Sequence, residues 1–280
     1  MIVRIGDIEL LSLSDGDGVF PFGFDGVFPD VPLAEIAPWR AVYPAAFAGE
    51  THPPARYGAF ALRTPTATVL IDTGFGSETG PFPPGGLLLG ALASHGIMAA
   101  DVDVVAFSHL HPDHVGQTFA ADGEAVFEHA RYVVAAADWR HFTDPARAAD
   151  FPWIAGQVAP LAARELHLLS AGAEHELVEG VVAVPAPGHT PGHTALVVRS
   201  RGAQALLLAD AFFHPAQLAQ PEWRNSADTD PAAAIATRHA LLARVLDLDV
   251  VVGACHFPEP ALGRVATVAG EPRWLPLVLE

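Results

Sequence analysis

The sequence predicts a single α/β domain over residues 1–280. Two observations lead to this prediction. Short apolar runs rich in valine and leucine recur along the chain, and their length is typical of strands buried on both faces. Helical patterns lie between some of these runs, and no stretch rich in proline or serine separates them into two units. The chain is long enough to bury one large hydrophobic core.

The first 58 residues divide into a strand and an irregular arm. Alternation over residues 3–13 predicts an opening strand, and Ser14-Asp15-Gly16-Asp17-Gly18 predicts a turn. The arm is dense in Pro, Gly and Phe, and residues 17–21 are echoed in residues 25–29, too few copies for a stacked repeat. Two interpretations stay open: phenylalanines that hold a loop to the surface, or an aromatic wall over a pocket or dimer contact.

From residue 59 onward, predicted strands alternate with predicted helices. Apolar runs predict strands at 68–71, 102–107, 132–136, 181–184, 195–198, 205–208 and 249–254. The clearest helical patterns cover 87–95 and 231–246, and the second has Asp230 as N-cap and Pro231 in its first turn. Residues 59–256 are expected to form the core, and 257–280 a C-terminal tail.

The composition excludes several classes of function. A formal charge of −17, from 32 acidic and 15 basic residues, argues against a nucleic-acid partner. All the basic residues are arginine, which excludes P-loops, Schiff-base enzymes and Ser-Lys hydrolases. The single cysteine, Cys255, excludes a disulfide framework or an iron–sulfur cluster held by this chain alone. No run approaches the roughly 18 apolar residues of a spanning helix, and no secretory signal opens the sequence, so we expect a cytoplasmic protein without a membrane partner.

The strongest functional signal is the segment His109-Leu110-His111-Pro112-Asp113-His114. It follows the predicted strand 102–107, so its side chains are expected at one rim of a sheet. Three imidazoles and a carboxylate this close together cannot all be buried for packing, because each needs its own partner. This set of side chains suits two divalent cations.

Further candidate ligands stand where other predicted strands end. The segment Gly188-His189-Thr190-Pro191-Gly192-His193 follows the run 181–184, Asp210 follows the run 205–208, and His256 follows the run 249–254. Strand ends of this kind can converge on one rim, which scattered surface histidines would not do. The sequence therefore predicts a metal site built from several segments.

With these residues the chain resembles the metallo-β-lactamase superfamily of hydrolases. The resemblance covers roughly residues 59–256 and includes Val69-Leu70-Ile71-Asp72-Thr73-Gly74, which is similar to that family's segment before the metal motif. It implies a four-layer αββα sandwich made of two similar halves, with the site at one edge. It also implies two divalent metal ions, zinc in the first place, with manganese, iron and cobalt as alternatives.

The resemblance also implies a role for each ligand. His109, His111 and His189 would bind the first ion, Asp113, His114 and His256 the second, and Asp210 would bridge both. Asp72 would support the ligand loop, and His193 is expected to support its turn rather than bind metal. Cys255 is expected to be a core thiol that faces away from the metals.

Within the superfamily, the sequence narrows the choice of reaction. Secreted zinc β-lactamases carry cysteine at the position of Asp210, and flavin-linked members have a further domain. What remains is hydrolysis of a small-molecule lactone or similar ester, with a phosphotriesterase or a glyoxalase II-like thioesterase as alternatives. A non-catalytic metal-binding protein is a remote alternative, because structural zinc sites are usually closed and single.

In the implied mechanism, a hydroxide that bridges the metals attacks the substrate carbonyl, and Asp113 is the candidate proton shuttle. The family's lactonases usually place a tyrosine where this chain has Phe213, and the neighbouring His214 is a candidate substitute. The aromatic supply predicts a roomy apolar pocket that would take an acyl or aryl group, drawn from Phe20, Phe22, Phe24, Phe28, Phe212, Phe213 and Trp223. The apolar arm makes a homodimer an expectation.

Overall fold

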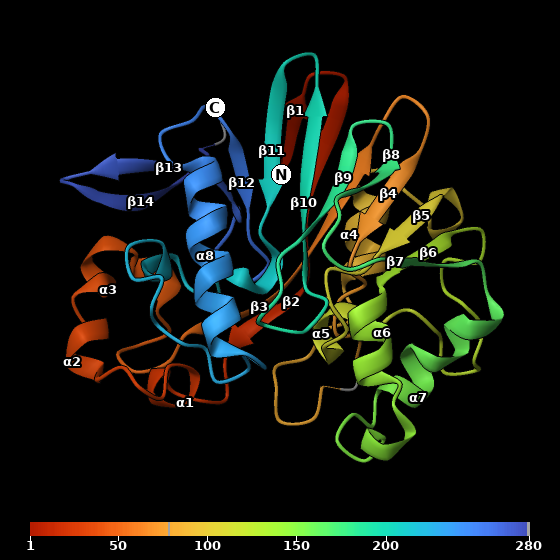
Figure 1. Ribbon diagram of the computed structural model, residues 1–280, viewed down its shortest axis with the longest axis horizontal. Coiled ribbons are helices and arrows are strands. Elements are labelled where there is room, and N and C mark those ends of the chain that lie inside the picture. Colours follow the sequence, from red (N-terminus) through yellow and green to blue (C-terminus); the bar gives the residue numbers. More distant parts are fainter. Residues whose placement is uncertain (78, 279–280) are drawn as a thin grey trace.

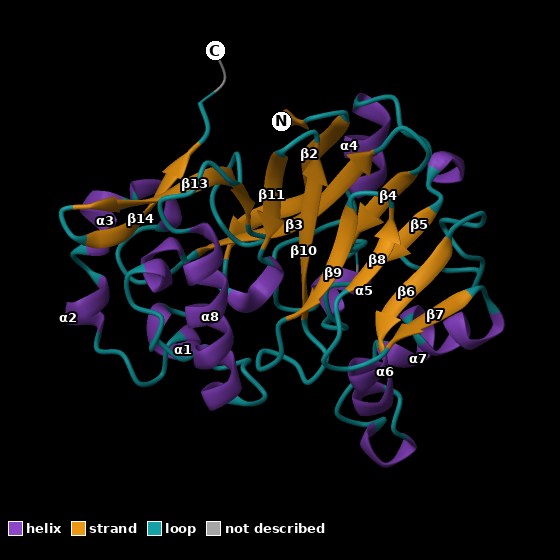
Figure 2. Ribbon diagram, turned by 45° about the horizontal axis from the view of Figure 1, so that its top comes forward, coloured by secondary structure: helices purple, strands orange, loops and turns teal. Residues whose placement is uncertain are grey.

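The computed structural model describes residues 1–77 and 79–278. Two seven-stranded sheets pack face to face, and a layer of helices covers the outer face of each sheet (Figure 1). Figure 2 shows the helices gathered on two sides of the strands. This arrangement confirms the expected four-layer αββα sandwich.

The first sheet contains the N-terminal strands in sequence order. Its strands β1 to β4 pair antiparallel, whereas β4 to β7 pair parallel. The strands are β1 (Ile2–Ile5), β2 (Ile8–Val19), β3 (Pro54–Arg63), β4 (Thr68–Ile71), β5 (Val104–Ala106), β6 (Arg131–Ala135) and β7 (Leu166–Leu169). Its outer helices are α4 (Leu88–Ser94), α5 (Pro112–Val115), α6 (Ala136–Phe142) and α7 (Ile154–Gln157), with short 3₁₀ turns at Ala99–Asp101, Pro145–Arg147 and Ala159–Ala163.

The second sheet contains the C-terminal strands, in the order β14-β13-β12-β11-β10-β9-β8, and only the pair β11–β12 is parallel. The strands are β8 (His175–Val178), β9 (Val181–Pro185), β10 (Thr194–Ser200), β11 (Ala203–Leu207), β12 (Val251–Gly253), β13 (Leu262–Val268) and β14 (Glu271–Pro276). Its outer layer holds α8 (Pro231–Val245), α1 (Phe24–Val27), α2 (Leu33–Ile36) and α3 (Trp39–Val42), with 3₁₀ turns at Pro44–Ala46, Ala209–Ala211 and Pro215–Leu218.

Strand residues alternate between two hydrophobic cores, which explains why the strands are apolar on both faces. Leu10 and Val69 pack in the core between the sheets, whereas their neighbours Leu11 and Leu70 pack under the outer helices. A third core joins the second sheet to α8 and the arm. Because both faces are buried, each strand end is held firmly, and the loops that follow are well placed to carry a site.

Three segments differ from the sequence-based expectation. The predicted strand 3–13 is a hairpin of β1 and β2, with a tight turn at Gly6, where φ is 58°. The prediction joined the two strands because apolar and polar residues alternate on both sides of the turn. The expected turn at 14–18 lies within β2, where the register shifts between Ser14 and Asp17. The expected C-terminal tail contains β13 and β14, whose connecting turn has positive φ at Ala269 and Gly270.

The arm folds into α1 to α3 and packs against the rest of the chain. The aromatic rings of Phe24, Phe28 and Trp39 are buried in the third core, and the backbone N–H of Trp274 in β14 donates to the hydroxyl of Tyr43 at 3.0 Å. The two echoed segments differ, because residues 17–19 end β2 whereas residues 25–27 lie in α1. A homodimer through this arm stays a prediction. Within the described residues, no helix has the length and apolarity to cross a membrane.

Candidate metal centre

All seven predicted ligands, together with Asp72, meet at one edge of the sandwich, where five strands end. Asp72 follows β4, the segment from His109 to His114 follows β5, His189 follows β9, Asp210 follows β11 and His256 follows β12. The seven side chains form two groups within which the ligand atoms lie no more than 4.8 Å apart: His109, His111 and His189 in one, and Asp113, His114, Asp210 and His256 in the other.

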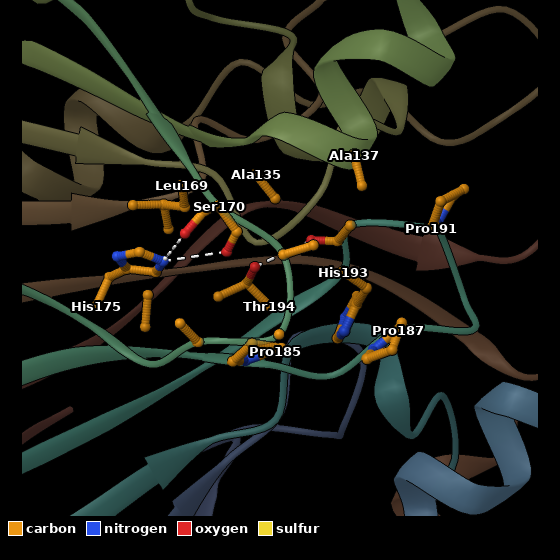
Figure 3. Close-up of a pocket in the computed structure, with 15 residues that line it drawn as sticks. Ala135, Ala137, Leu169, Ser170, His175, Pro185, Pro187, Pro191, His193 and Thr194 are labelled. Atoms are coloured by element: carbon orange, nitrogen blue, oxygen red, sulfur yellow. Dashed lines mark hydrogen bonds between the residues drawn. The ribbon is translucent and has the colours of Figure 1, made fainter.

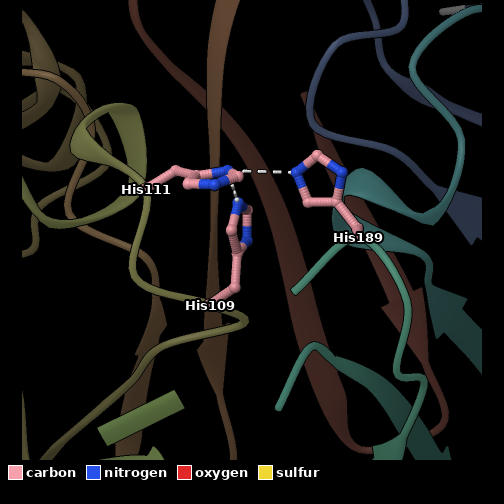
Figure 4. A group of neighbouring side chains, drawn as sticks. All are labelled: His109, His111 and His189. Carbon is pink, nitrogen blue, oxygen red and sulfur yellow. Dashed lines mark hydrogen bonds between the residues drawn. The ribbon is translucent and has the colours of Figure 1, made fainter. Parts of the chain in front are cut away.

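The first group is made only of histidines, and Figure 4 shows the three rings meeting. The Nδ1 atom of His111 lies 3.0 Å from Nε2 of His109 and 3.1 Å from Nε2 of His189. Two nitrogens on one tetrahedral zinc ion, with bonds of about 2.05 Å, would be about 3.3 Å apart. The three rings therefore fit one tetrahedral cation and leave one coordination position for another ligand.

The second group is centred on the carboxylate of Asp210. Its Oδ2 atom lies 2.9 Å from Nε2 of His256, 3.4 Å from Nε2 of His114 and 3.6 Å from Nε2 of His189 in the first group. The other oxygen, Oδ1, and the Nε2 atom of His114 are buried and have no hydrogen-bond partner. Two orphaned buried atoms at one point are costly unless something else binds them. The donor set therefore fits a divalent cation, with Asp210 between the two groups.

The rear nitrogens of the histidines are held by the surrounding structure. Rings that bind metal usually donate their second N–H in this way, which fixes their orientation. His114 Nδ1 donates to Asp72 at 2.8 Å, His189 Nδ1 to Asp228 at 3.2 Å, and His256 Nδ1 to the backbone carbonyl of Arg56 at 2.8 Å. The hydroxyl of Ser108 lies 3.1 Å from His109 Nδ1 and donates to Asp72 at 2.7 Å.

His193 positions Asp210 rather than facing the two groups. Its Nδ1 donates to the carbonyl of Ala186 at 3.0 Å, and its Nε2 accepts the backbone N–H of Asp210 at 3.1 Å. The residue before Asp210, Ala209, has φ of 47°, and Asp72 has φ of 65°. Left-handed backbone at residues other than glycine stores strain, and here both cases adjoin the ligand set.

The residues that support His189 from behind were not predicted from the sequence. The carboxylate of Asp228 accepts from His189 on one side and from the guanidinium of Arg238 in α8, 3.2 Å away, on the other. Arg238 is 1% exposed. Asp138 in α6 accepts from the hydroxyl of Thr190 at 2.7 Å and thereby ties down the same turn. None of these residues shares a motif with its partner, so spacing along the chain carried no signal for them.

The charges favour cation binding. Burial, and then the neighbouring imidazoles, lower the pKa of His109 and His111 well below its usual value, so both rings are neutral as metal ligands must be. Burial acts the same way on His114, but the neighbouring carboxylates, above all Asp210, raise its pKa well above the usual value. Burial would raise the pKa of Asp210, yet His256 and His114 lower it well below its usual range. A metal entering the second group must therefore displace protons.

A cavity of about 240 Å³ opens beside the two groups. Five of the ligands line it, and Phe20 and Phe213 line it as expected. The ring of Phe213 lies 4.9 Å from that of His256. Phe22, one of the aromatic residues predicted at the pocket, also lines it. The remaining wall residues were not predicted from the sequence: Val27, Tyr57, Phe75, Phe82, Pro112, Asn225, Ser226 and Ala227.

Five residues expected at the pocket lie elsewhere: Phe24, Phe28, Phe212, His214 and Trp223. The three phenylalanines and Trp223 are buried in the core beside α8. The arm turns inward at α1 after Phe22, which carries Phe24 and Phe28 away from the cavity. His214 is not an exposed loop residue, since it is 2% exposed and donates through Nε2 to the carbonyl of Ala46 at 3.1 Å. It therefore cannot replace the hydroxyl that Phe213 lacks.

Cys255 is a core thiol as expected, but it does not face away from the ligands. β12 ends at Gly253, so strand alternation does not govern the cysteine, and its sulfur lies within 4.8 Å of donor atoms of Asp72 and His114. The thiol is buried in the core between the sheets, and this burial raises its pKa well above the usual value.

A second cavity, of about 120 Å³, is lined mainly by alanines and prolines and includes His193 but none of the seven ligands (Figure 3).

Comparison with known proteins adds to this geometry. Residues 59–256 match the family model described as the metallo-beta-lactamase superfamily. AidC, described as a dizinc quorum-quenching lactonase in complex with a product, N-hexanoyl-L-homoserine, is 24% identical, with a TM-score of 0.84 over 100% of this chain and 98% of that chain. The hydrolase AbOPH is 25% identical, with a TM-score of 0.87 over 100% and 97%. A probable metal-dependent hydrolase from Staphylococcus aureus is 22% identical, with a TM-score of 0.84 over 99% and 100%. No curated protein matches the chain.

Proposed function

Since this chain belongs to the metallo-beta-lactamase superfamily, we propose that it is a two-metal hydrolase, with zinc as the expected metal, that acts on uncharged lactones with an apolar substituent. The observation that carries the proposal is the composition of the cavity beside the ligands. Aromatic side chains form most of its wall outside the ligands. Among the described residues that line it, none is arginine, and the chain contains no lysine.

Beyond the ligands, a cavity wall without arginine or lysine selects against substrates that carry an anionic group away from the metals. A buried anionic group needs a cationic or strongly donating partner, and a wall of rings offers none. Thioesters of the glyoxalase II kind carry carboxylates on their thiol part, so this wall disfavours them. Lactones and phosphotriesters are both neutral, and both remain compatible with it. The likeness to AidC, a dizinc quorum-quenching lactonase, favours the lactone.

The ligand set defines what the residues of this chain would do. When bound, the two ions would polarise the carbonyl oxygen of the substrate and lower the pKa of water. His109, His111 and His189 would hold one ion, and Asp113, His114 and His256 the other, with Asp210 shared between them. The held rear nitrogens would keep the rings aimed at the ions, and the aromatic wall would exclude bulk water from the reacting carbonyl.

Asp113 is the residue that we propose moves the proton. Its Oδ2 atom lies 3.5 Å from Nε2 of His256 and 3.6 Å from Nε2 of His114. Its side chain is 19% exposed, whereas that of Asp210 is 6% exposed, and it lines the cavity. A carboxylate with one face toward the ligands and one toward the substrate can pass a proton to the departing alkoxide.

Proton release at constant pH tests the proposal directly. The zinc-loaded protein and its chelator-stripped form are compared on an aliphatic lactone, an aryl phosphotriester and an acyl thioester. We expect kcat/KM for the lactone to exceed that for the others by more than about tenfold, or about 1.4 kcal/mol. A larger value for the phosphotriester would transfer the proposal to that substrate.

Two variants define the dependence on the site. Asp210→Ala is expected to lose one equivalent of metal and most turnover. His129→Ala serves as the matched control, because His129 is exposed and belongs to neither group of ligands. Full metal content in the wild type without turnover of any of the three substrates would favour the non-catalytic alternative instead.

A further inference from the structure

Asp15 is a fully buried carboxylate outside the metal site, and nothing in the proposed reaction uses it. It lies at a bulge in β2, where Asp15 and Gly16 stand opposite the single residue Tyr57 of β3. Such bulges turn a side chain away from the regular pleat and occur often beside active sites. Here the bulge directs the carboxylate into the segment between β4 and α4.

Five N–H groups donate to this carboxylate. Oδ2 accepts the backbone N–H groups of Phe75 at 2.8 Å and Gly76 at 2.9 Å. Oδ1 accepts those of Gly86 at 3.0 Å and Leu88 at 2.9 Å, together with the side-chain amide of Gln117. No basic side chain pairs with Asp15 among the described residues, so these N–H groups satisfy the buried charge.

The two oxygens thus hold the two ends of one loop. We call residues 75–77 and 79–88 the aromatic loop, since it carries Phe75 and Phe82 to the wall of the cavity. A Cβ on Gly74 or Gly85 would come within 2.5 Å of Asp15 atoms, so the neighbouring chain is built to approach this carboxylate closely. A third attachment is the Tyr57 hydroxyl, which donates to the carbonyl of Pro83 at 2.8 Å.

A series of aromatic rings in contact connects the aromatic loop to the metal ligands. Phe82 contacts Phe20 with ring centroids 5.4 Å apart, Phe20 contacts Phe213 at the same separation, and Phe213 contacts His256 at 4.9 Å. Phe75 contacts Phe82 at 5.5 Å. Edge-to-face packing of this kind depends on the position of each ring. The placement of the loop therefore sets the shape of the wall against which a substrate would lie.

We propose that Asp15 is a positioning residue for substrate specificity: by holding both ends of the aromatic loop, it presets Phe75 and Phe82 as the wall that binds the apolar part of the substrate. The proposal rests on the proposed lactone hydrolysis for its substrate. A wall fixed before binding needs no ordering when the substrate arrives, which favours affinity. The effect of Asp15 should therefore fall on KM, and only for substrates long enough to reach the loop.

The test compares Asp15→Asn with Asp17→Asn, an exposed acidic residue two positions along the same strand, as matched control. Asparagine keeps one acceptor but turns an amide donor toward backbone N–H groups, so one end of the loop is released. For a lactone with a long alkyl substituent, Asp15→Asn should raise KM by about tenfold, because the alkyl chain would lose part of its contact with one ring. KM for γ-butyrolactone, kcat and the metal content should stay near those of the control.

Hydrogen exchange supplies a readout that needs no turnover. The amides of residues 75, 76, 86 and 88 should exchange faster in Asp15→Asn and unchanged in Asp17→Asn. A double-mutant cycle with Phe82→Ala then asks whether Asp15 acts through the ring. We expect Phe82→Ala to raise KM for the long-chain lactone, and the double variant to be no worse than the worse single variant.

Several results would overturn the proposal: additive effects in the cycle, an unchanged KM despite faster exchange, or a fall in metal affinity with KM unaltered. If Asp15→Asn does not fold, Phe82→Ala alone decides, because an unchanged KM would remove the role of the wall. If the wild type hydrolyses no lactone, the proposed function fails separately. Calorimetric affinity for the same long-chain lactone then decides the role of Asp15, and equal affinity in both proteins, or no binding, would refute it.

Discussion

The buried ring of His214 should make the stability of this protein depend on pH. Its Nε2 donates to the carbonyl of Ala46 and its Nδ1 accepts the backbone N–H of Ala216, each at 3.1 Å, so the bonded form is the neutral ring. The rings of Phe24, Phe28 and Phe47 surround it. Burial lowers the pKa of His214 from 6.5 to about 4. A proton on Nδ1 would also point at the backbone N–H of Ala216, whose hydrogen bond Nδ1 now accepts.

The sign and size of the effect follow from this pKa. Between pH 6.5 and 4 the unfolded chain binds a proton at this position that the folded chain does not, so the free energy of unfolding falls as the pH falls. At about 1.4 kcal/mol for each pH unit, the total loss is about 3 kcal/mol, and it is complete below pH 4. Above pH 6.5 this contribution is fully present.

Urea unfolding at a series of pH values from 7.5 to 4, with chelator present throughout, measures the effect. His214→Asn keeps an acceptor for the N–H of Ala216 and cannot titrate. Over this range the free energy of unfolding of the variant should therefore fall by about 3 kcal/mol less than that of the wild type. His129→Asn, whose side chain is 66% exposed, is the control and should follow the wild type. Parallel curves for wild type and His214→Asn would refute the reasoning, because the titrating histidines of the metal centre are common to both.

Three further predictions concern the centre and its surroundings. Asp228→Asn should weaken metal binding by about tenfold or more, since His189 loses its charged partner, and chelator competition that gives the wild-type affinity would contradict this. Gly58→Ala should lower the free energy of unfolding by about 1–3 kcal/mol in urea titrations, because a Cβ there would collide with the backbone carbonyl of Cys255. Phe213→Tyr places a hydroxyl beside the ligands and should raise kcat/KM for a lactone by about tenfold; an equal gain for a phosphotriester would show that the hydroxyl does not act on the lactone carbonyl.

The ligands could be predicted from sequence because each follows a strand whose apolar run is local and unmistakable. The strand at 68–71 and the helix beginning after Asp230 were also predictable, since both have simple patterns and a clear boundary. Asp228 and Asp15 were not, because their partners lie far along the chain and only the fold brings them together. The bulge that directs Asp15 inward contains Asp and Gly residues, which also occur in ordinary turns, so the sequence did not distinguish the two.

Each of the two groups of ligands contains residues from both halves of the chain. His109 to His114 lie between strands of the first sheet, whereas His189, Asp210 and His256 follow strands of the second. A cation bound by either group would therefore be a cross-link between the two halves, beside hydrogen bonds such as that from His256 to the backbone carbonyl of Arg56. Such a cross-link can form only after the two halves have docked, so metal uptake should be a late step of folding. Chelation should accordingly loosen the contact between the sheets before it unravels either one.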